Sequence, residues 1–165
     1  MCLSCVNTAS NCTSCTAVSI TNYFLQPTGL LCLSTCPVGF YGNASTFTCP
    51  QCDSRCSACT GPTNGSCSAC KIDNTGVSHF LLPGSNSCSD TCPDSLYANS
   101  STFRCEVCDT NCLKCFNMST NCTLCKPITE SPQIYLQNST CVDKCDSVFF
   151  QFGLTCIKVC PNGTK

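Results

Sequence analysis

The sequence has no tryptophan, a single histidine and few charges, with eight lysines and arginines against nine aspartates and glutamates in 165 residues. Neither sign forms a run, whereas binding to nucleic acids and anionic lipids depends on clustered lysine and arginine. No apolar run approaches the roughly 18 residues of a membrane span. We therefore expect no nucleic-acid partner and no direct membrane insertion of this segment.

The first residues lack the features of a signal peptide, because MCLSCVNTAS has neither a basic start nor an apolar segment. We interpret the chain as a mature segment or as part of a longer protein.

Cysteine, in contrast, is abundant: the 24 cysteines exceed the level at which a disulfide or metal scaffold becomes the default class. The hydrophobic fraction of 42% includes them, so few large apolar side chains remain to offset the loss of conformational entropy on folding. We expect covalent links to supply what a conventional core does not.

The cysteines recur with a period of about 55 residues, which indicates tandem repeats. The pattern predicts repeats at residues 1–51, 52–107 and 108–159. Residues 160–165 would begin a further repeat or link to the next copy. The first repeat lacks the first cysteine of the pattern.

Segments between the cysteines also repeat and predict two hairpins per repeat. The first hairpin is expected in YFLQPTGLLC (23–32), HFLLPGSNSC (79–88) and IYLQNSTC (134–141). The second is expected in CPVGFYGNASTFTC (36–49), CPDSLYANSSTFRC (92–105) and CDSVFFQFGLTC (145–156). No stretch keeps a helical apolar period over three turns. The predicted fold class is a small disulfide-rich ladder of β-hairpins with almost no helix, stacked into an elongated rod.

The apolar residues of these hairpins are expected to pack beside the disulfides. They are Phe24, Leu25, Phe40, Tyr41, Phe80, Leu81, Leu96, Tyr97, Tyr135, Leu136, Phe149 and Phe150.

The cysteines follow the spacing C-x3-C-x2-C-x7-C-x2-C, and then C-x3-C-P with an apolar–aromatic pair, as in CSDTCPDSLY and CLSTCPVGFY. This pattern resembles the furin-like repeat, or growth factor receptor cysteine-rich domain. The resemblance covers the whole chain. The low charge and the serine, threonine and asparagine content also look like ciliate cysteine-rich surface proteins. The chain departs from the pattern where Asp146 replaces the proline found at Pro37 and Pro93.

Spacing alone does not determine the disulfides, since eight cysteines allow 105 pairings. The resemblance implies that the first four cysteines of a repeat pair one with three and two with four, and that the last four pair in sequence. The implied bonds are Cys2 with Cys12, Cys15 with Cys32, Cys36 with Cys49, Cys52 with Cys59, Cys56 with Cys67, Cys70 with Cys88, Cys92 with Cys105, Cys108 with Cys115, Cys112 with Cys122, Cys125 with Cys141, and Cys145 with Cys156.

Two cysteines, Cys5 and Cys160, remain unpaired in this scheme. Joining the end of one copy to the start of another gives CPNGTKMCLSC, in which Cys160 would bridge to Cys5 of the following copy. We therefore expect head-to-tail contact with copies of the chain or with further repeats. A contact of this kind propagates into a filament unless it closes into a ring.

N-glycosylation sequons point to the compartment. Two of them, at Asn43 and Asn99, stand at equivalent places, seven residues after Cys36 and Cys92. Together with the cysteines they predict an N-glycosylated protein that is secreted or displayed on the cell surface. The eight acceptors are Asn11, Asn43, Asn64, Asn99, Asn117, Asn121, Asn138 and Asn162.

Other sulfur and histidine chemistry is disfavoured. Paired C-x2-C knuckles bind structural zinc, but here they continue into C-x3-C spacings, and His79 is the one histidine. Thioredoxin-type chemistry needs a C-x2-C at a helix start, which the pattern does not predict. His79 aligns with Tyr23 and Ile134, which suggests a hairpin residue and not a base. We predict a protein that is not an enzyme, with no catalytic, cofactor-binding or metal-binding residues.

Two functional classes follow. We favour a structural extracellular segment of a cell-surface coat, a filament or a long repeat array. The alternative is a recognition module that binds a protein partner, as such repeats do in growth factor receptors. The alternative would use FFQF (149–152), where Phe152 stands in the place of the sequons at Asn43 and Asn99; the other reading of this segment is a rearranged hairpin.

Overall fold

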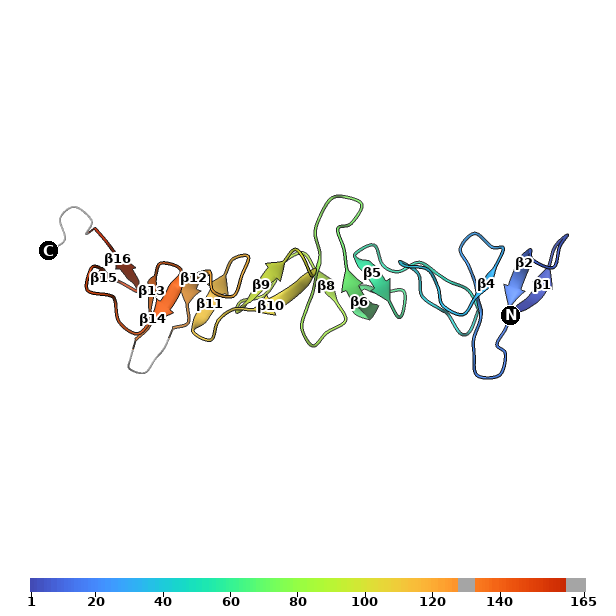
Figure 1. Cartoon of the computed structure of the whole chain (residues 1–165), viewed down its shortest axis with the longest axis horizontal. Helices are drawn as coiled ribbons and strands as arrows, with labels where there is room; N and C mark the ends of the chain where they lie inside the picture. The colour runs from blue at the N-terminus through green and yellow to red at the C-terminus, as the bar shows by residue number, and fades with distance from the viewer. Residues whose placement is uncertain (128–132, 160–165) are drawn as a thin grey trace. The chain divides into compact units, whose positions relative to one another are not determined.

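Short antiparallel β-hairpins make up almost all of the regular structure (Figure 1). The computed structural model describes residues 1–127 and 133–159. In this part of the chain the one helical element is the 3-10 turn η1 (Asn64–Ser66). The predicted class, a disulfide-rich fold of hairpins with almost no helix, is confirmed.

The chain divides into two compact units, Met1–Asp90 and Thr91–Lys165, and each is described by itself. The division falls between the two hairpins of the second predicted repeat. The repeat boundaries and the rod stay predictions.

The C-x2-C segments form a hairpin of their own, which the sequence patterns did not predict. Each segment is a four-residue strand that pairs with the next C-x2-C segment, with register shifts in the middle. A disulfide joins the two strands of each pair, and this bond stabilises strands that are too short to persist alone. The pairs are β1 (Cys2–Cys5) with β2 (Cys12–Cys15), β5 (Cys56–Cys59) with β6 (Cys67–Cys70), and β11 (Cys112–Cys115) with β12 (Cys122–Cys125).

The first predicted hairpin is present in all three repeats. The tightest copy turns at Asn138 and Ser139, whose positive φ values of 47° and 64° fit a two-residue turn of type I′. The hairpins are β3 (Phe24–Leu25) with β4 (Cys32–Leu33), β7 (Phe80–Leu81) with β8 (Cys88–Ser89), and β13 (Tyr135–Gln137) with β14 (Thr140–Val142).

The second predicted hairpin forms strands in two repeats, as β9 (Leu96–Asn99) with β10 (Arg104–Val107) and as β15 (Phe150–Phe152) with β16 (Thr155–Ile157). The equivalent segment of the first repeat has only single bridges, one of which pairs Asn43 with Thr48. In the second unit β13 also pairs in parallel with β16, which gives a four-stranded sheet in the order β14-β13-β16-β15.

Asp146, the departure from the repeat pattern, links the start of this last segment to Gln137 of β13. Its backbone N–H donates to Gln137 Oε1 at 2.9 Å, and its carboxylate accepts from Gln137 Nε2. A proline could not make the first of these bonds, because it has no N–H. The substitution therefore supplies a partner for Gln137, which is buried.

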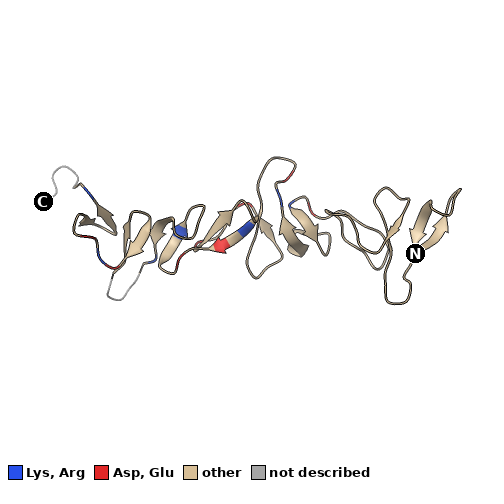
Figure 2. Ribbon diagram, viewed as in Figure 1, with Lys and Arg blue, Asp and Glu red and all other residues tan. Residues whose placement is uncertain are grey.

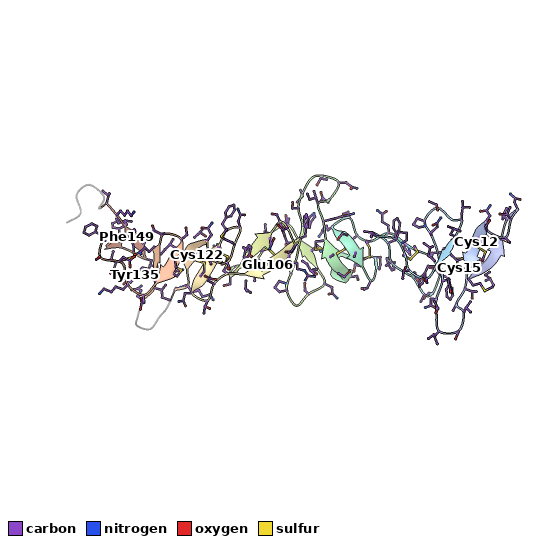
Figure 3. All side chains as sticks on the ribbon, viewed as in Figure 1. Cys12, Cys15, Glu106, Cys122, Tyr135 and Phe149 are labelled. Atoms are coloured by element: carbon purple, nitrogen blue, oxygen red, sulfur yellow. A yellow bond between two sulfur atoms is a disulfide. The ribbon has the colours of Figure 1, made fainter. Side chains whose placement is uncertain are left out.

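Cystine dominates the interior. Thirteen of the sixteen buried apolar residues in the described chain are cysteines, and the other three are Phe80, Leu81 and Ile134. Figure 3 shows the disulfides between the short strands, with long side chains around them. The disulfides thus occupy the place of a conventional hydrophobic core.

Most of the expected apolar residues are buried or half-buried beside the disulfides, but Phe150 is not. Its side chain is 56% exposed and lies on β15, an outer strand of its sheet. Its neighbour Phe149 is half-buried, and Lys158 Nζ lies 5.5 Å from the centre of the Phe149 ring. The expectation that Phe150 packs beside a disulfide is therefore wrong.

Gly42 provides a test of packing in the first unit. A Cβ atom added there would lie 2.6 Å from Cζ of Phe24, closer than atoms pack. We predict that Gly42→Ala lowers the free energy of unfolding by roughly 1–3 kcal/mol, the usual cost of overpacking, in urea unfolding under non-reducing conditions. Gly65→Ala is the control, since its added Cβ meets nothing closer than 3.8 Å. Equal stability of the two variants would contradict the packing of Phe24 against Gly42.

Candidate functional site

The disulfide ladder is the feature that all three repeats share. The structure contains eleven disulfides among the described residues, and they are the same eleven pairs that the family resemblance implies. They join cysteines that lie 7 to 18 residues apart. Each bond closing a loop of this size stabilises by about 2–4 kcal/mol on the chain-entropy model, although neighbouring bonds do not add simply.

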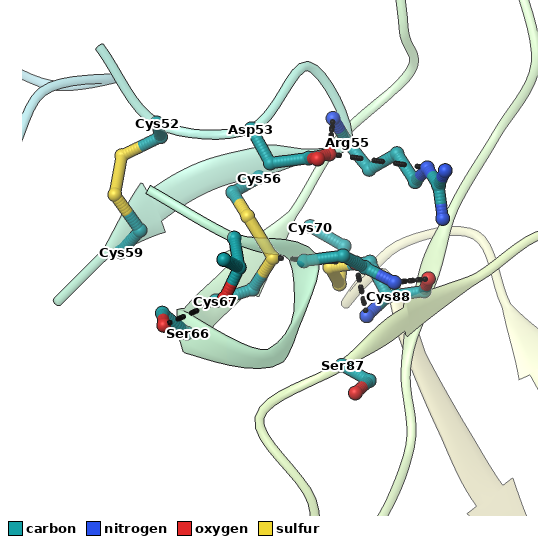
Figure 4. Close-up of a disulfide and its surroundings, with 12 residues drawn as sticks. Cys52, Asp53, Arg55, Cys56, Cys59, Ser66, Cys67, Cys70, Ser87 and Cys88 are labelled. Atoms are coloured by element: carbon teal, nitrogen blue, oxygen red, sulfur yellow. Dashed lines mark hydrogen bonds and ion pairs between the residues drawn. A yellow bond between two sulfur atoms is a disulfide. The ribbon is translucent and has the colours of Figure 1, made fainter. Parts of the chain in front are cut away.

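Two of the bonds in a complete repeat interlock (Figure 4). The bond Cys52–Cys59 closes a loop that contains Cys56, and Cys56 is bonded to Cys67 outside that loop. Cys56 and Cys67 are fully buried. The next bond, Cys70–Cys88, links β6 to β8 and so connects this hairpin to the one that follows.

Sulfur atoms of neighbouring disulfides lie close together. Among the described residues there are four groups of three cysteines whose sulfurs are all within 4.8 Å of one another, as in Cys112, Cys122 and Cys141. Spacing of this kind resembles a metal site, but the thiolate is the metal ligand, and each of these sulfurs is bonded to another sulfur. These groups could bind a metal ion only after reduction.

Cys5 is the one cysteine of residues 1–127 and 133–159 that has no disulfide, and it is exposed. Its equivalents in the other repeats, Cys59 and Cys115, are bonded to the first cysteine of their repeat. The predicted partner, Cys160, lies outside the described residues. The structure therefore presents a thiol at a position where the pattern of the repeat has a disulfide.

His79 is buried at the start of the first hairpin of its repeat. Its Nε2 lies 2.9 Å from Asp73 Oδ2, and its Nδ1 has no hydrogen-bond partner among the described residues. Bonds from His79 and Thr75 hold the pKa of the Asp73 carboxyl far below its usual range. A histidine oriented by a carboxylate is also a catalytic arrangement, but it requires a nucleophile within hydrogen-bonding distance of the free ring nitrogen. Asp73 Oδ1 also accepts the N–H groups of Thr75 and Val77, so the pair closes the loop of residues 73–77.

His79 and Asp73 also line a polar hollow of about 600 Å³ in the first unit, together with Arg55, Asn64 and Asp90. Arg55 is directed to Asp53, with Nε 3.8 Å from Oδ1 (Figure 4). The aligned residue Ile134 is buried as well, so the position of His79 is an interior position of the hairpin.

A second polar cluster centres on Glu106 in the second unit. Its carboxylate accepts bonds of 2.9 Å from Tyr97 Oη, Asn99 Nδ2 and Thr102 Oγ1. The bond from Asn99, followed by those from Tyr97 and Thr102, lowers the pKa of Glu106, and the same carboxylate raises the pKa of Tyr97. The cluster joins β9 to β10 and to the turn between them.

The sequons differ in exposure. Asn117 and Asn138 are exposed, and the side chains of the other described acceptors are half-buried: Asn11, Asn43, Asn64, Asn99 and Asn121. Asn162 lies outside the described residues. Sequence alone did not separate these sites, because every sequon has the same three-residue pattern.

The strand β15 is exposed over all three of its residues, and Phe150 and Phe152 expose 56% and 50% of their area. Phe152 ends its strand opposite Thr155, as Asn99 ends β9 opposite Arg104. An aromatic side chain thus occupies the place that carries a sequon in the preceding repeat.

Charged residues are dispersed along the described segments (Figure 2). The ion pair between Lys114 and Asp94, with Nζ and Oδ1 3.2 Å apart, is exposed at both ends, where such pairs stabilise little. Within residues 1–127 and 133–159 the structure contains no helix with the length and apolarity needed to cross a bilayer.

Comparison with known proteins finds no matching family model but several relatives. The chain is 32% identical to proprotein convertase subtilisin/kexin type 6 of Rattus norvegicus. The match covers 118 residues, or 72% of this chain and 12% of that protein. It is also 34% identical to cysteine repeat modular protein 2 of the ciliate Tetrahymena thermophila. The match covers 90 residues, or 52% of this chain and 5% of that protein.

A third relative is the human extracellular matrix organizing protein FRAS1, with 32% identity over 143 residues, which is 86% of this chain and 3% of that protein. The chain thus spans 12% or less of the length of these relatives. The matched parts are cysteine-rich repeat regions of larger proteins.

The Glu106 cluster predicts an acid-dependent stability of the second unit. The folded-state pKa of Glu106 lies below the unfolded value of about 4.5, so its contribution to stability is present above that pH and is lost as the pH falls through the folded pKa. The melting temperature of the unmodified chain should fall between pH 6 and pH 2, in part because Glu106 becomes protonated. We predict a smaller fall over the same range in Glu106→Gln, which has no carboxylate to protonate. Tyr97→Phe, which removes one donor, should raise the Glu106 pKa in an NMR titration. An unchanged Glu106 pKa in that variant would contradict the cluster.

Proposed function

From its disulfide order and its homologues the chain is a series of furin-like cysteine-rich repeats, and on this premise we propose that it is a structural segment of an extracellular coat, filament or long repeat array. The relatives support a non-enzymatic structural or recognition module. The finer assignment to a structural array is our proposal.

One observation carries this proposal: the same ladder of disulfides recurs from repeat to repeat, and each bond lies within one predicted repeat. Each of the two complete repeats is thus closed by its own covalent bonds. Units of this kind can be added in series without a change of interior, as in other repeat proteins.

An extracellular location fits the same bonds. Disulfides persist in oxidising compartments and are rare in the cytosol, where thiols are kept reduced. One relative is named as an extracellular matrix organizing protein, and cysteine repeats give another its name.

Cys5 supports the continuation of the ladder from one copy to another. In the other repeats the equivalent cysteine is bonded to a cysteine seven residues earlier, and at Cys5 that partner is missing from the described chain. We propose that Cys160 of a preceding copy or repeat supplies it. The bond would extend the array covalently and in one direction.

The test is the mass of the full chain, secreted from eukaryotic cells, under non-reducing conditions. We predict disulfide-linked multimers that collapse to a single band on reduction, and their loss in Cys5→Ser. The control is Leu3→Ser, which changes an exposed residue on the same strand and keeps the thiol. A discrete monomer of the unmodified chain, with Cys5 and Cys160 free or bonded to each other, would contradict the proposal.

A second candidate, a recognition module, is favoured by β15 alone. Its outer edge is unpaired in the sheet, and two phenylalanines on it are at least half exposed. Exposed apolar groups on an edge strand are a common basis for protein binding.

Phe150→Ser together with Phe152→Ser tests this candidate. Because both side chains are exposed, the double variant should unfold within about 0.5 kcal/mol of the unmodified chain, whereas Ile134→Ser, at a buried position, should be strongly destabilised. A recognition role predicts that the double variant loses binding to the surface of cells that produce the protein. Unchanged binding would remove the recognition candidate.

A further inference from the structure

The side chain of Asn64 binds both polar backbone groups of one residue, Cys88. Its Oδ1 accepts the Cys88 N–H at 3.0 Å, and its Nδ2 donates to the Cys88 carbonyl at 3.1 Å. Asn64 lies in the turn η1, and Cys88 lies in β8, 24 residues later. The amide thus bridges two segments that the sequence keeps apart.

Asn64 provides hydrogen-bond partners for the backbone N–H and C=O of Cys88, which have no partner in the opposite strand of the described hairpin. Cys88 lies opposite Leu81 in the hairpin of β7 and β8, and its own N–H and C=O are directed to Asn64. Cys88 is only 2% exposed, so these groups would be costly to leave without partners. The side-chain amide of Asn64 has the same donor and acceptor as a peptide group, so it binds Cys88 as the backbone of a neighbouring strand would.

The pairing also fixes a particular hydrogen of Asn64. Oδ1 and Nδ2 both face one residue, so the hydrogen that donates is the one on the same side of the amide as Oδ1. A glycosylated asparagine is a secondary amide, and in the trans form of such an amide the substituent lies on the same side as the oxygen. The first sugar would therefore replace the hydrogen that binds Cys88.

We infer that Asn64 is a structural clamp on Cys88 and not an N-glycan acceptor in the folded protein, and that Asn138 is an acceptor. The inference rests on the proposed extracellular function, since N-glycans are added along the secretory route.

Asn138 has the opposite environment to Asn64. It is exposed at the two-residue turn between β13 and β14, and its amide makes no hydrogen bond in the described structure. The sequon threonine, Thr140, is exposed as well. A glycan on Asn138 would extend from the tip of a hairpin without loss of an internal bond.

In two other sequons the asparagine side-chain nitrogen also donates a hydrogen bond, but this bond does not prevent attachment of a glycan. Asn99 Nδ2 donates to Glu106 and Asn121 Nδ2 donates to the Phe116 carbonyl, with one bond each. Each of these nitrogens retains a second hydrogen. Among the described sequons, Asn64 is the one whose amide binds a single residue at both ends.

The experiment maps glycans and disulfides together on the full chain secreted from eukaryotic cells. Enzymatic removal of N-glycans in ¹⁸O-water marks each occupied asparagine, and peptide mass spectrometry without reduction identifies the bonds. We expect the label at Asn138 and its absence at Asn64 in the molecules that contain Cys56–Cys67 and Cys70–Cys88. Label at Asn64 in those molecules would overturn the clamp, and a secreted chain without label at Asn138 would overturn that assignment.

Two variants separate the clamp from the sequon. Ser66→Ala and Asn64→Ala both destroy the sequon, but only the second removes the amide. We expect Ser66→Ala to keep the glycan pattern and the slow hydrogen exchange of the Cys88 N–H. Asn64→Ala should speed that exchange by about tenfold or more and lower the melting temperature. Equal exchange in the two variants would refute the clamp.

The same experiments distinguish this inference from the proposed function. A chain that is retained in the cell and carries no glycan at any sequon would contradict the extracellular function and the acceptor role of Asn138. The exchange comparison at Cys88 would still decide the clamp, because it depends on the fold alone.

Discussion

The disulfide is the interaction on which the rest of this structure depends. Strands of two to four residues cannot persist by ladder hydrogen bonds alone, and few large side chains are buried beside them. Cross-links between neighbouring strands reduce the entropy of the unfolded chain and so replace the area that a larger core would bury. The cystines also fill the interior themselves, since thirteen of the sixteen buried apolar residues in the described part of the chain are cysteines.

A covalent ladder leaves the residues between the cysteines free to vary, and the second and third predicted repeats contain polar bonds of different kinds. In the second predicted repeat Asn64 binds the backbone of Cys88, and Glu106 gathers three donors around one carboxylate. In the third, Gln137 pairs with Asp146 where the other repeats have proline. These bonds satisfy buried polar groups locally, so they adapt single hairpins without a change in the ladder. Such local variation suits a series of structural units, and it also provides places, such as β15, where one unit can acquire a contact surface.

Some features could not be predicted because they depend on what a segment meets in space. The C-x2-C segments are too short to show a strand pattern, yet they pair as strands because a disulfide holds them together. Phe150 belongs to an apolar pair like those of the other repeats, but its side chain is exposed, whereas Leu96 and Tyr97 of the equivalent pair are half-buried. Asn64 and Asn138 both lie in N-x-S/T sequons, and only the position of Cys88 makes the amide of one of them a structural group.

The sequence by itself determined the class of fold, the hairpins between the cysteines and the repeat, because these follow from local spacing and from turn residues that act over a few positions. The resemblance to furin-like repeats supplied the order of the disulfides, which spacing leaves open. The tertiary structure decided which asparagine has a free amide and which aromatic side chains face solvent, whereas the unpaired thiol, Cys5, already followed from the pairing that the resemblance implies. The amide of Asn64, for example, depends on Cys88, which lies 24 residues later, and no local pattern encodes the distance between such groups.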